Sequence, residues 1–311
     1  MPWPSKRQLV DAVCGLLRPF DISIERPTEL WRGLALIGRQ PVPPPTAEPP
    51  RPAFLRSFGA AGNGADYDFA VVMPSMLRPA IGRALRSVFA QDFPGRVQTL
   101  VGVDCAGPGL EALEAACRDC PPNHAVMVLD PGYSTSVRRG GLHPAWDGGV
   151  LRTVLTYLAA SRRVAYLDDD NWWAPDHLSR MAAALDGHEW AWSLRHFVHP
   201  RSFRTICQDA WESIGSQPDG TGFVDPNCLA IDKLACEAVL RWWSIPLRNS
   251  TTGTDADRQI CRLLATHFRG RGTGRASVFY VLAEEDQQHP RRLERIGPAQ
   301  YAASGETVPA M

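Results

Sequence analysis

The chain has 311 residues, of which 44% are apolar and 21% are charged, a composition typical of a soluble globular protein. Its 33 Lys and Arg residues balance 33 Asp and Glu residues, so the zero net charge argues against a general nucleic-acid-binding protein. No stretch approaches the roughly 20 apolar residues of a transmembrane helix, and no secretory signal follows the N-terminus. A cytoplasmic location is therefore predicted, with peripheral attachment to the inner face of a membrane as the alternative.

Residues 1–65 are predicted to be an N-terminal extension outside the main domain. Leucines recur at helical spacing within residues 1–40, and seven of the twelve residues from Pro41 to Pro52 are proline. Such a proline run favours polyproline II and acts as a semi-rigid spacer. The domain itself is predicted over residues 66–296, followed by a flexible tail over residues 297–311.

Strands and helices alternate over the first half of this domain, residues 66–174. Short apolar runs predict strands at residues 69–73, 97–103, 125–129 and 164–167, with helices between them. This alternation predicts a Rossmann-like α/β fold, in which right-handed crossovers join the strands of a mostly parallel sheet flanked by helices. Ligands bind such sheets beyond the carboxyl ends of the strands. The polar residues at those ends are Ser75, Asp104 and the run from Asp168 to Asp170.

The order changes in the second half, residues 175–296. Helices are expected over about 175–185 and 233–242 and from Thr254 onward, and strands over 190–198, 223–231 and 277–282. Residues 270–275 (GRGTGR) predict either a flexible turn or a loop whose amides and arginines close over an anion.

The three consecutive aspartates form the main candidate site. Side chains alternate along a strand, so Asp168 and Asp170 should share one side while Asp169 points away. Two carboxylates on one side suit a hard cation, Mn²⁺ or Mg²⁺, that also binds phosphate oxygens. The alternative is a solvated turn in which Asp170 or Asn171 caps the next helix.

Four segments resemble family 2 glycosyltransferases of the GT-A fold, in the order found in that family. YLDDDNWWAPDHL (166–178) resembles the DxD segment, in which a strand ends in aspartates and a Pro-Asp and a helix follow. FAVVMPSMLRPAIGRALRSVFAQDFP (69–94) resembles the first strand, loop and helix, and VQTLVGVDCAG (97–107) resembles the second strand with its nucleobase-reading Asp. LRTVLTYLAASRRVAYLDDD (151–170) resembles the helix that leads to the DxD segment. The resemblance spans about residues 68–268.

The resemblance implies a role for each matching residue in binding a nucleotide-sugar. Asp170 and Asp168 would bind the metal, and Asp168 would also support the nucleotide-sugar. Asp169 would contact the metal or the ribose. The remaining implied nucleotide-sugar contacts are Pro74, Ser75, Asp104 and Arg152.

Several of these positions keep a second interpretation. Asp104 also fits a turn before Gly107, and Arg152 also fits a surface arginine on a helix. The sequence departs from the family at Ser75–Leu77, where Thr-Tyr-Asn is usual, and at Thr153, where Asn is usual. Both departures affect nucleotide contacts, so the fold is better indicated than the base.

The second half supplies candidates for the acceptor side. An inverting transfer needs a carboxylate that takes the proton of the attacking hydroxyl, and Asp255 or Asp257 fits, with Asp255 aligned to the family's residue. Thr254 and Asp257 also fit a capping box, and the helix dipole favours either carboxylate. Trp192, Trp242 and Trp243 are candidates for stacking on an acceptor sugar, with core packing as the alternative.

The expected activity is metal-dependent transfer of a sugar from a nucleoside diphosphate sugar to an acceptor hydroxyl, with inversion. The favoured donor is a UDP-sugar, the cofactor is Mn²⁺ or Mg²⁺, and a glycan, a lipid-linked molecule or a protein would be the acceptor. One alternative is a catalytically silent GT-A-like binding or scaffold protein. The other is a nucleotidyltransferase, although that class usually has a glycine-rich loop and residues 73–79 contain no glycine.

Overall fold

The computed structural model describes residues 51–59, 66–105, 107–145, 147–216, 222–245, 256–284 and 288–305. The chain divides into two units, residues 1–42 and 43–311, and every described residue lies in the second. The predicted N-terminal helix and most of the proline-rich segment lie outside the described residues. Within these ranges, no helix is both long enough and apolar enough to cross a membrane.

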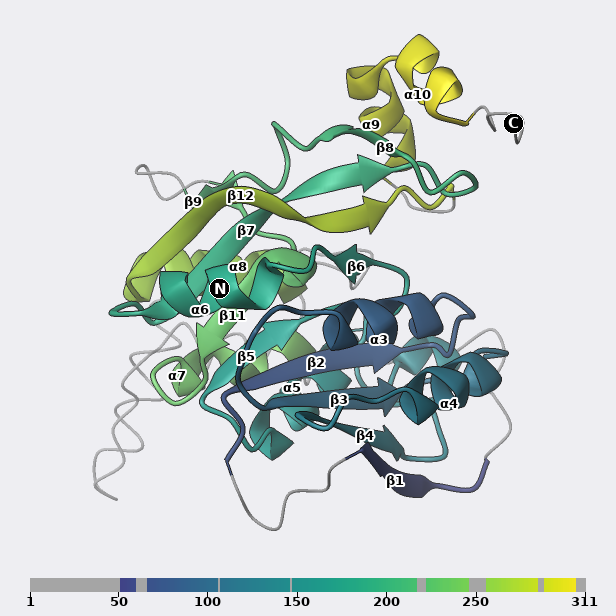
Figure 1. Cartoon of the computed structure of the whole chain (residues 1–311), viewed down its shortest axis with the longest axis vertical. Helices are drawn as coiled ribbons and strands as arrows, with labels where there is room; N and C mark the ends of the chain where they lie inside the picture. The colour runs from purple at the N-terminus through teal and green to yellow at the C-terminus, as the bar shows by residue number, and fades with distance from the viewer. Residues whose placement is uncertain are drawn as a thin grey trace, which may run out of the picture. The chain divides into compact units, whose positions relative to one another are not determined.

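Four parallel strands form the first half of the main sheet (Figure 1). Their order is β4-β3-β2-β5, and all seven residues of β2 are buried, as expected for a Val-rich strand at the centre of a parallel sheet. The strands are β2 (Phe69–Ser75), β3 (Val97–Val103), β4 (His124–Asp130) and β5 (Arg163–Tyr166). The predicted parallel βα half is therefore confirmed.

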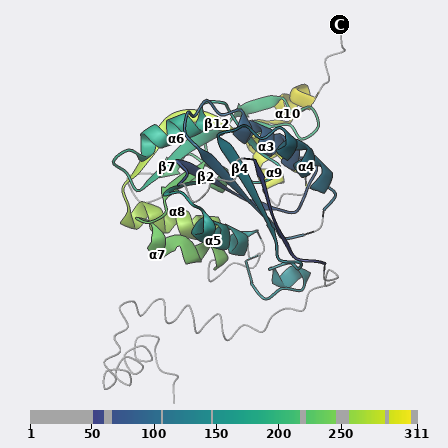
Figure 2. The same ribbon diagram turned by 60° about the horizontal axis from the view of Figure 1, so that its bottom comes forward.

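Helices cover both faces of this half (Figure 2). On one face, α3 and α4 pack against each other. On the other face, α5 packs on β2 and β3 and also contacts η4, which in turn contacts α8. The elements are α3 (Ile81–Phe89), α4 (Leu110–Arg118), α5 (Gly149–Leu158), α7 (Glu237–Leu240), η4 (Arg241–Ser244) and α8 (Ala256–His267).

The second half extends the same sheet with strands of mixed direction. β11 lies antiparallel between β5 and β7, β12 runs parallel to β7, and β6 closes the far edge antiparallel to β12. β8 pairs with β7, β9 pairs with β10, and α6 packs on β7 and β12. The elements are β6 (Trp172–Trp173), α6 (His177–Leu185), β7 (Trp190–Val198), β8 (Thr205–Gln208), β9 (Gly215–Ser216), β10 (Gly222–Phe223), η3 (Pro226–Cys228), β11 (Leu229–Asp232) and β12 (Gly270–Val281).

Residues 270–275 are not the predicted loop, because they form the first half of β12. A Cβ atom at Gly270 would lie 2.2 Å from Cε2 of Trp190, and one at Gly272 would lie 2.9 Å from the indole of Trp192. The glycines therefore make room for two indole rings on the neighbouring strand.

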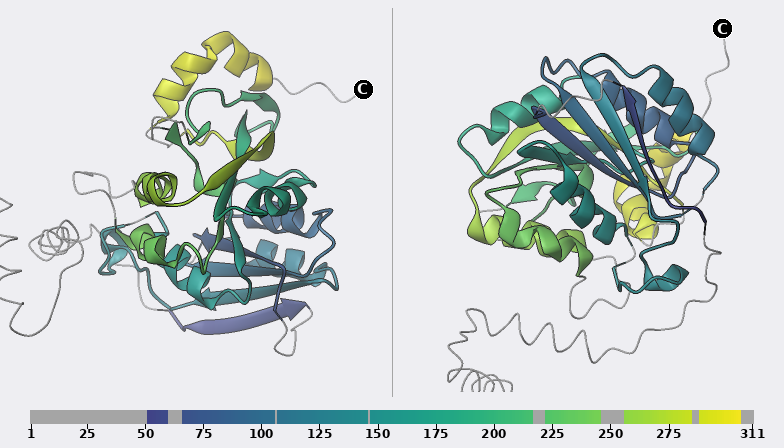
Figure 3. Two further views of the ribbon diagram at one scale, coloured as in Figure 1. Left: turned by 90° about the vertical axis from the view of Figure 1, so that its left-hand side faces the viewer. Right: turned by 90° about the horizontal axis from the view of Figure 1, so that it is seen from below.

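Both ends of the predicted domain extend beyond its expected limits (Figure 3). β1 (Phe54–Gly59) pairs antiparallel with β4 at the edge of the sheet, although the sequence predicts that residues 1–65 form an extension outside the domain. At the other end, α9 (His289–Ile296) is followed by α10 (Pro298–Gly305) within the predicted tail. β1 could not be predicted from the sequence, because the proline and glycine runs on either side of it indicate a linker.

Candidate functional site

The carboxyl ends of β2, β3 and β5 meet at one edge of the sheet. The backbone N–H of Asp104 donates to the carbonyl of Ser75 at 2.9 Å, and that of Leu167 donates to the carbonyl of Val72 at 3.0 Å. The strand-end residues predicted from the sequence are thus neighbours in the fold.

The carboxylate of Asp169 is fully buried and holds the loop that follows β2. It accepts hydrogen bonds from Ser75 Oγ at 2.7 Å and from the backbone N–H of Met76 at 3.1 Å. The guanidinium of Arg78 pairs with its other oxygen at 2.6 Å. Protein donors reach both oxygens and the side chain is fully buried, so Asp169 shapes the loop, and its predicted contact with the metal or the ribose stays a prediction.

The outer carboxylates of the triplet remain partly open to solvent. The side chain of Asp168 is 28% exposed and that of Asp170 is 33% exposed. Burial beside Asp168 and Asp169 raises the pKa of Asp170 to about 7, even though Arg78 lies 3.2 Å away and opposes the shift. A cation placed here would relieve the repulsion between these carboxylates.

Asp168 is oriented by two neighbours from other elements. Its backbone N–H donates to Oδ1 of Asn227 at 2.7 Å, and Nδ2 of Asn227 donates back to its carboxylate at 2.9 Å. Arg152 also donates to this carboxylate. One oxygen of Asp168 is therefore paired with Arg152 and the other with Asn227, and the carboxylate is held in one orientation.

Arg152 is not a surface arginine, because only 5% of it is exposed. It donates to the carbonyl of Asp147 at 2.5 Å, and its Nε has no hydrogen-bond partner among the described residues. Burial raises the pKa of the nearby Asp147 carboxyl to about 6. The start of α5 can pack this closely because residue 149 is glycine, where a Cβ would lie 1.8 Å from the carbonyl oxygen of Trp243.

Asp104 anchors the loop after β4. One of its oxygens accepts from the backbone N–H and Oγ1 of Thr135 at 2.8 and 2.9 Å, and the other accepts from Ser134 Oγ at 2.9 Å. Neither loop residue is among the site residues predicted from the sequence. The carboxylate expected to read a nucleobase is thus hydrogen-bonded within the protein.

The structure describes one of the two candidate bases. Asp257 lies in the first turn of α8, and burial raises its pKa to about 8, with Asp147 and Asp225 adding to the shift. Asp255 and Thr254 lie outside the described residues, so the choice of base and the capping box stay predictions.

Two of the three tryptophans expected to stack on an acceptor lie in the core instead. Trp242 and Trp243 are 4% and 1% exposed, and the ring of Trp243 packs 4.9 Å from that of Tyr166. This burial agrees with core packing, the alternative given by the sequence, and their acceptor role stays a prediction. Trp192 is only partly buried and tilts over Trp190 at 4.7 Å.

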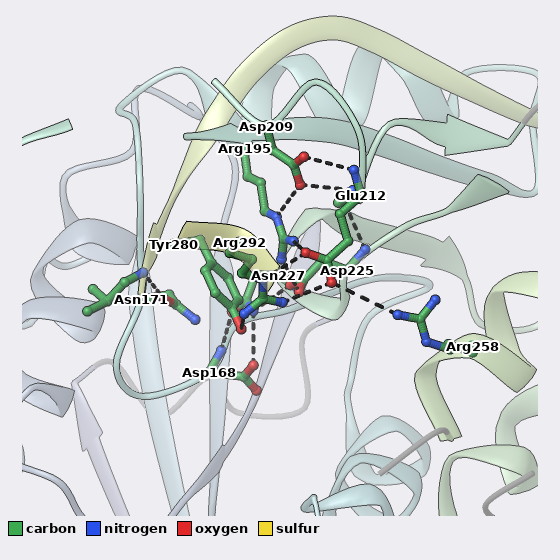
Figure 4. A network of polar contacts seen from close by, with 12 residues as sticks. Asp168, Asn171, Arg195, Asp209, Glu212, Asp225, Asn227, Arg258, Tyr280 and Arg292 are labelled. Atoms are coloured by element: carbon green, nitrogen blue, oxygen red, sulfur yellow. Dashed lines mark hydrogen bonds and ion pairs between the residues drawn. The ribbon is translucent and has the colours of Figure 1, made fainter. Parts of the chain in front are cut away.

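A buried ionic network was missing from the sequence predictions (Figure 4). Arg195 is fully buried in β7 and pairs with Asp209 at 2.8 Å, Glu212 at 3.0 Å and Asp225 at 2.5 Å. Asp225 accepts from Nδ2 of Asn227, which also holds Asp168. The network therefore reaches from the second half of the sheet to the aspartate triplet. The sequence offered one signal for it, a single arginine inside the mostly apolar strand WAWSLRHFV.

No protein-family model matches the sequence, and no curated protein is significantly similar to it. The solved structure of S. aureus TarS is similar with a TM-score of 0.50 at 14% identity, covering 76% of this chain and 43% of that chain. The S. aureus TarS 1-349 complex with UDP-GlcNAc has a TM-score of 0.50 at 16% identity, with 76% and 69% covered. The mannosyltransferase PcManGT from Pyrobaculum calidifontis, in complex with GDP-Man and Mn²⁺, has a TM-score of 0.49 at 14% identity, with 86% and 67% covered.

This chain spans less than half of the longer TarS structure. At such low identities a structural likeness establishes the fold alone. The fold is the GT-A fold of glycosyltransferases, as the resemblance in the sequence predicts.

Proposed function

We propose that this chain is a metal-dependent glycosyltransferase that moves a sugar from a nucleoside diphosphate sugar to an acceptor hydroxyl. The observation that carries the proposal is the division of the aspartate triplet on a GT-A fold. Asp169 is turned inward to build the loop, and Asp168 and Asp170 are left partly open at the carboxyl ends of the parallel strands. Ligands of parallel α/β sheets bind at this edge.

The donor set fits a hard divalent cation, Mn²⁺ or Mg²⁺. Among the described side chains no three His, Cys, Asp or Glu residues converge to enclose a metal. Mg²⁺ in phosphate-binding sites is commonly held by one or two carboxylates together with substrate oxygens, which matches Asp168 and Asp170. When bound, the cation would stabilise the negative charge that develops on the leaving diphosphate.

The protein's own groups orient this site and accept the proton. Asn227 and Arg152 hold the Asp168 carboxylate, and Arg78 is 46% exposed beside Asp170, where its guanidinium can face phosphate oxygens. A carboxylate at the start of α8, Asp255 or Asp257, takes the proton from the acceptor hydroxyl as it attacks, and the transfer inverts the anomeric centre. A UDP-sugar is the favoured donor, since the TarS 1-349 structure of the same fold holds UDP-GlcNAc.

The test is a binding screen with UDP, GDP, UDP-GlcNAc and GDP-Man, each with and without Mn²⁺, followed by thermal unfolding. A nucleotide that binds the folded state raises the melting temperature. We expect one nucleotide to stabilise the protein only with Mn²⁺, and we expect this shift to vanish in Asp170→Asn. Asp186→Asn, an exposed carboxylate at the end of α6, is the matched control and should respond like wild type.

The proposal fails if no nucleotide stabilises the wild-type protein in the presence of Mn²⁺. A binding protein without transferase activity is the second candidate, and it is favoured by the internal hydrogen bonds that occupy Asp104. Release of UDP from the stabilising UDP-sugar distinguishes the two. A transferase turns over its donor slowly even with water as the acceptor, whereas a silent protein releases no UDP.

A further inference from the structure

A basic pocket lies in the second half of the protein, outside the aspartate site. Its cavity volume is about 380 Å³, and it is lined by described residues of α8, α9, β10 and the segment before β9. Four arginines face it together with Trp211 and one carboxylate, Glu212; the arginines are Arg258, Arg291, Arg292 and Arg295.

The pocket has a surplus of positive charge, because its one carboxylate is already paired. Arg292 forms two hydrogen bonds with Glu212, at 2.8 and 2.9 Å. Arg195 contacts the same carboxylate from the buried side at 3.0 Å. In the part of the chain that the structure describes, neither Arg291 nor Arg295 forms an ion pair. At least two guanidinium groups are thus available to an anion.

Three of the four arginines are held by neighbouring side chains, whereas Arg291 is exposed on α9. Arg292 is 5% exposed, the guanidinium of Arg258 lies 4.5 Å from the ring of Phe223, and that of Arg295 lies 5.9 Å from the ring of Trp211. Guanidinium groups fixed in this way bind phosphate oxygens with two parallel hydrogen bonds and lose little entropy.

The pocket is connected to the aspartate site on its acceptor side. Arg258 directly follows the candidate base Asp257 on α8. Glu212 contacts Arg195, whose partner Asp225 binds Asn227 and thereby Asp168 (Figure 4). An anion held in the pocket would therefore be fixed relative to both the metal carboxylate and the base.

We propose that this pocket binds a phosphate group carried by the acceptor. The inference rests on the proposed function, since it names the chemical class of the acceptor for that site. It requires the pocket to be separate from the site that binds the diphosphate of the donor.

The experiment is a calorimetric titration of the full chain with inorganic phosphate at constant ionic strength, with and without saturating UDP and Mg²⁺. Wild type should bind phosphate equally well in both conditions. Arg291→Gln/Arg295→Gln should weaken phosphate binding at least tenfold. The control Arg118→Gln/Arg271→Gln removes the same charge from two exposed positions on α4 and β12 and should bind phosphate like wild type.

Equal phosphate affinity in Arg291→Gln/Arg295→Gln and in wild type would overturn the proposal, and so would displacement of phosphate by UDP. A separate failure of wild type to bind any of the four screened nucleotides would overturn the proposed function and leave the phosphate result standing. Glycerol 3-phosphate and phosphatidic acid vesicles are then offered to both double variants. If Arg291→Gln/Arg295→Gln loses binding of glycerol 3-phosphate and the control double variant does not, the phosphate belongs to a soluble acceptor; the same result with phosphatidic acid vesicles indicates a lipid acceptor. If the two double variants bind both ligands equally, an acceptor role is excluded.

Discussion

Neighbouring aspartates of the triplet have opposite environments, although β5 ends at Tyr166 and the triplet lies in the turn that follows it. Asp169 is fully buried among donors, whereas Asp168 and Asp170 are about one-third exposed. A buried carboxylate with a full set of donors stabilises the fold, and a partly exposed one beside like charges costs stability until a cation binds. Substitution of Asp169 should therefore lower the stability of the fold, whereas substitution of Asp168 or Asp170 should affect cation binding.

The pair Asp169→Asn and Asp170→Asn tests this division. Asp169→Asn removes the charge that pairs with Arg78 and leaves fewer acceptors for Ser75 and Met76, so we expect the free energy of unfolding to fall by about 3 kcal/mol. Asp170→Asn should leave stability unchanged or higher, since it removes a carboxylate whose ionised form is disfavoured. Urea denaturation measures both, and a larger loss in Asp170→Asn would contradict the assignment.

The raised pKa of Asp257 predicts a pH-dependent effect on stability. Folding raises this pKa from its ordinary 3.8 to about 8, so between these values the folded state binds more protons than the unfolded state. The stability contributed by this group therefore falls as pH rises across that window. Asp257→Asn lacks the titration. We therefore expect the melting temperature of the variant, relative to that of wild type, to be higher at pH 9 than at pH 5.

The control for this series is Asp186→Asn, which replaces an exposed carboxylate. Its melting temperature should follow that of wild type at every pH. If the difference in melting temperature between Asp257→Asn and wild type is the same at pH 5 and at pH 9, the group does not titrate in this range.

At the scale of elements, β12 shows why glycine patterns are hard to interpret from sequence. Gly270, Gly272 and Gly274 are typical of a turn or a loop, and the sequence alone predicts one of these. The strand forms because β7, 80 positions earlier at Trp190, pairs with it in parallel and presses two indole rings against the glycines. Local composition carries no information on that partner, whereas the apolar runs of β2 and β3 indicate burial by themselves.

Gly270→Ala should be costly for this reason. The new Cβ would lie 2.2 Å from Trp190, a fully buried residue whose Nε1 donates to the carbonyl of Phe268 at 3.2 Å. Neither the ring nor the strand can move freely, so we expect a loss of about 2 kcal/mol in the free energy of unfolding. Arg271→Ala, an exposed neighbour on the same strand, should change stability by less than about 0.5 kcal/mol. Equal effects in the two variants would show that the indole is not a barrier.

At the scale of the whole sheet, the two halves are joined by β11 and by the Arg195 network. The parallel half could be predicted because each of its strands is a local apolar run followed by a helix. The network could not, because Arg195, Asp209 and Asp225 are 14 to 30 residues apart and meet only when β7 and the segment before η3 pack together. The aspartate triplet was identified from sequence, but Asn227, which orients it, lies 59 residues away.

Removal of the central arginine should destabilise this whole region. Arg195→Met leaves Asp209 and Asp225 buried without their cation, and breaking a buried pair in this way costs about 3–5 kcal/mol. The double variant Arg195→Met/Asp225→Asn removes one of the uncompensated charges and should recover part of that loss. Arg162→Met is the matched control, since its pair with Asp232 is at the surface, where the arginine side chain is 67% exposed, and it should cost less than about 1 kcal/mol.

Because Asp225 also binds Asn227, the Arg195 variants test whether the buried network affects nucleotide binding at the aspartate triplet as well as the stability of the fold. If the network orients Asp168, Arg195→Met should weaken binding of the stabilising nucleotide with Mn²⁺ at a temperature where the variant is still folded. Restored nucleotide affinity in Arg195→Met/Asp225→Asn would show that charge compensation at Asp225 controls the carboxylate. If Arg195→Met lowers the free energy of unfolding but keeps wild-type nucleotide affinity, the network supports only the fold, and the aspartates are positioned by Arg152 and the parallel strands alone.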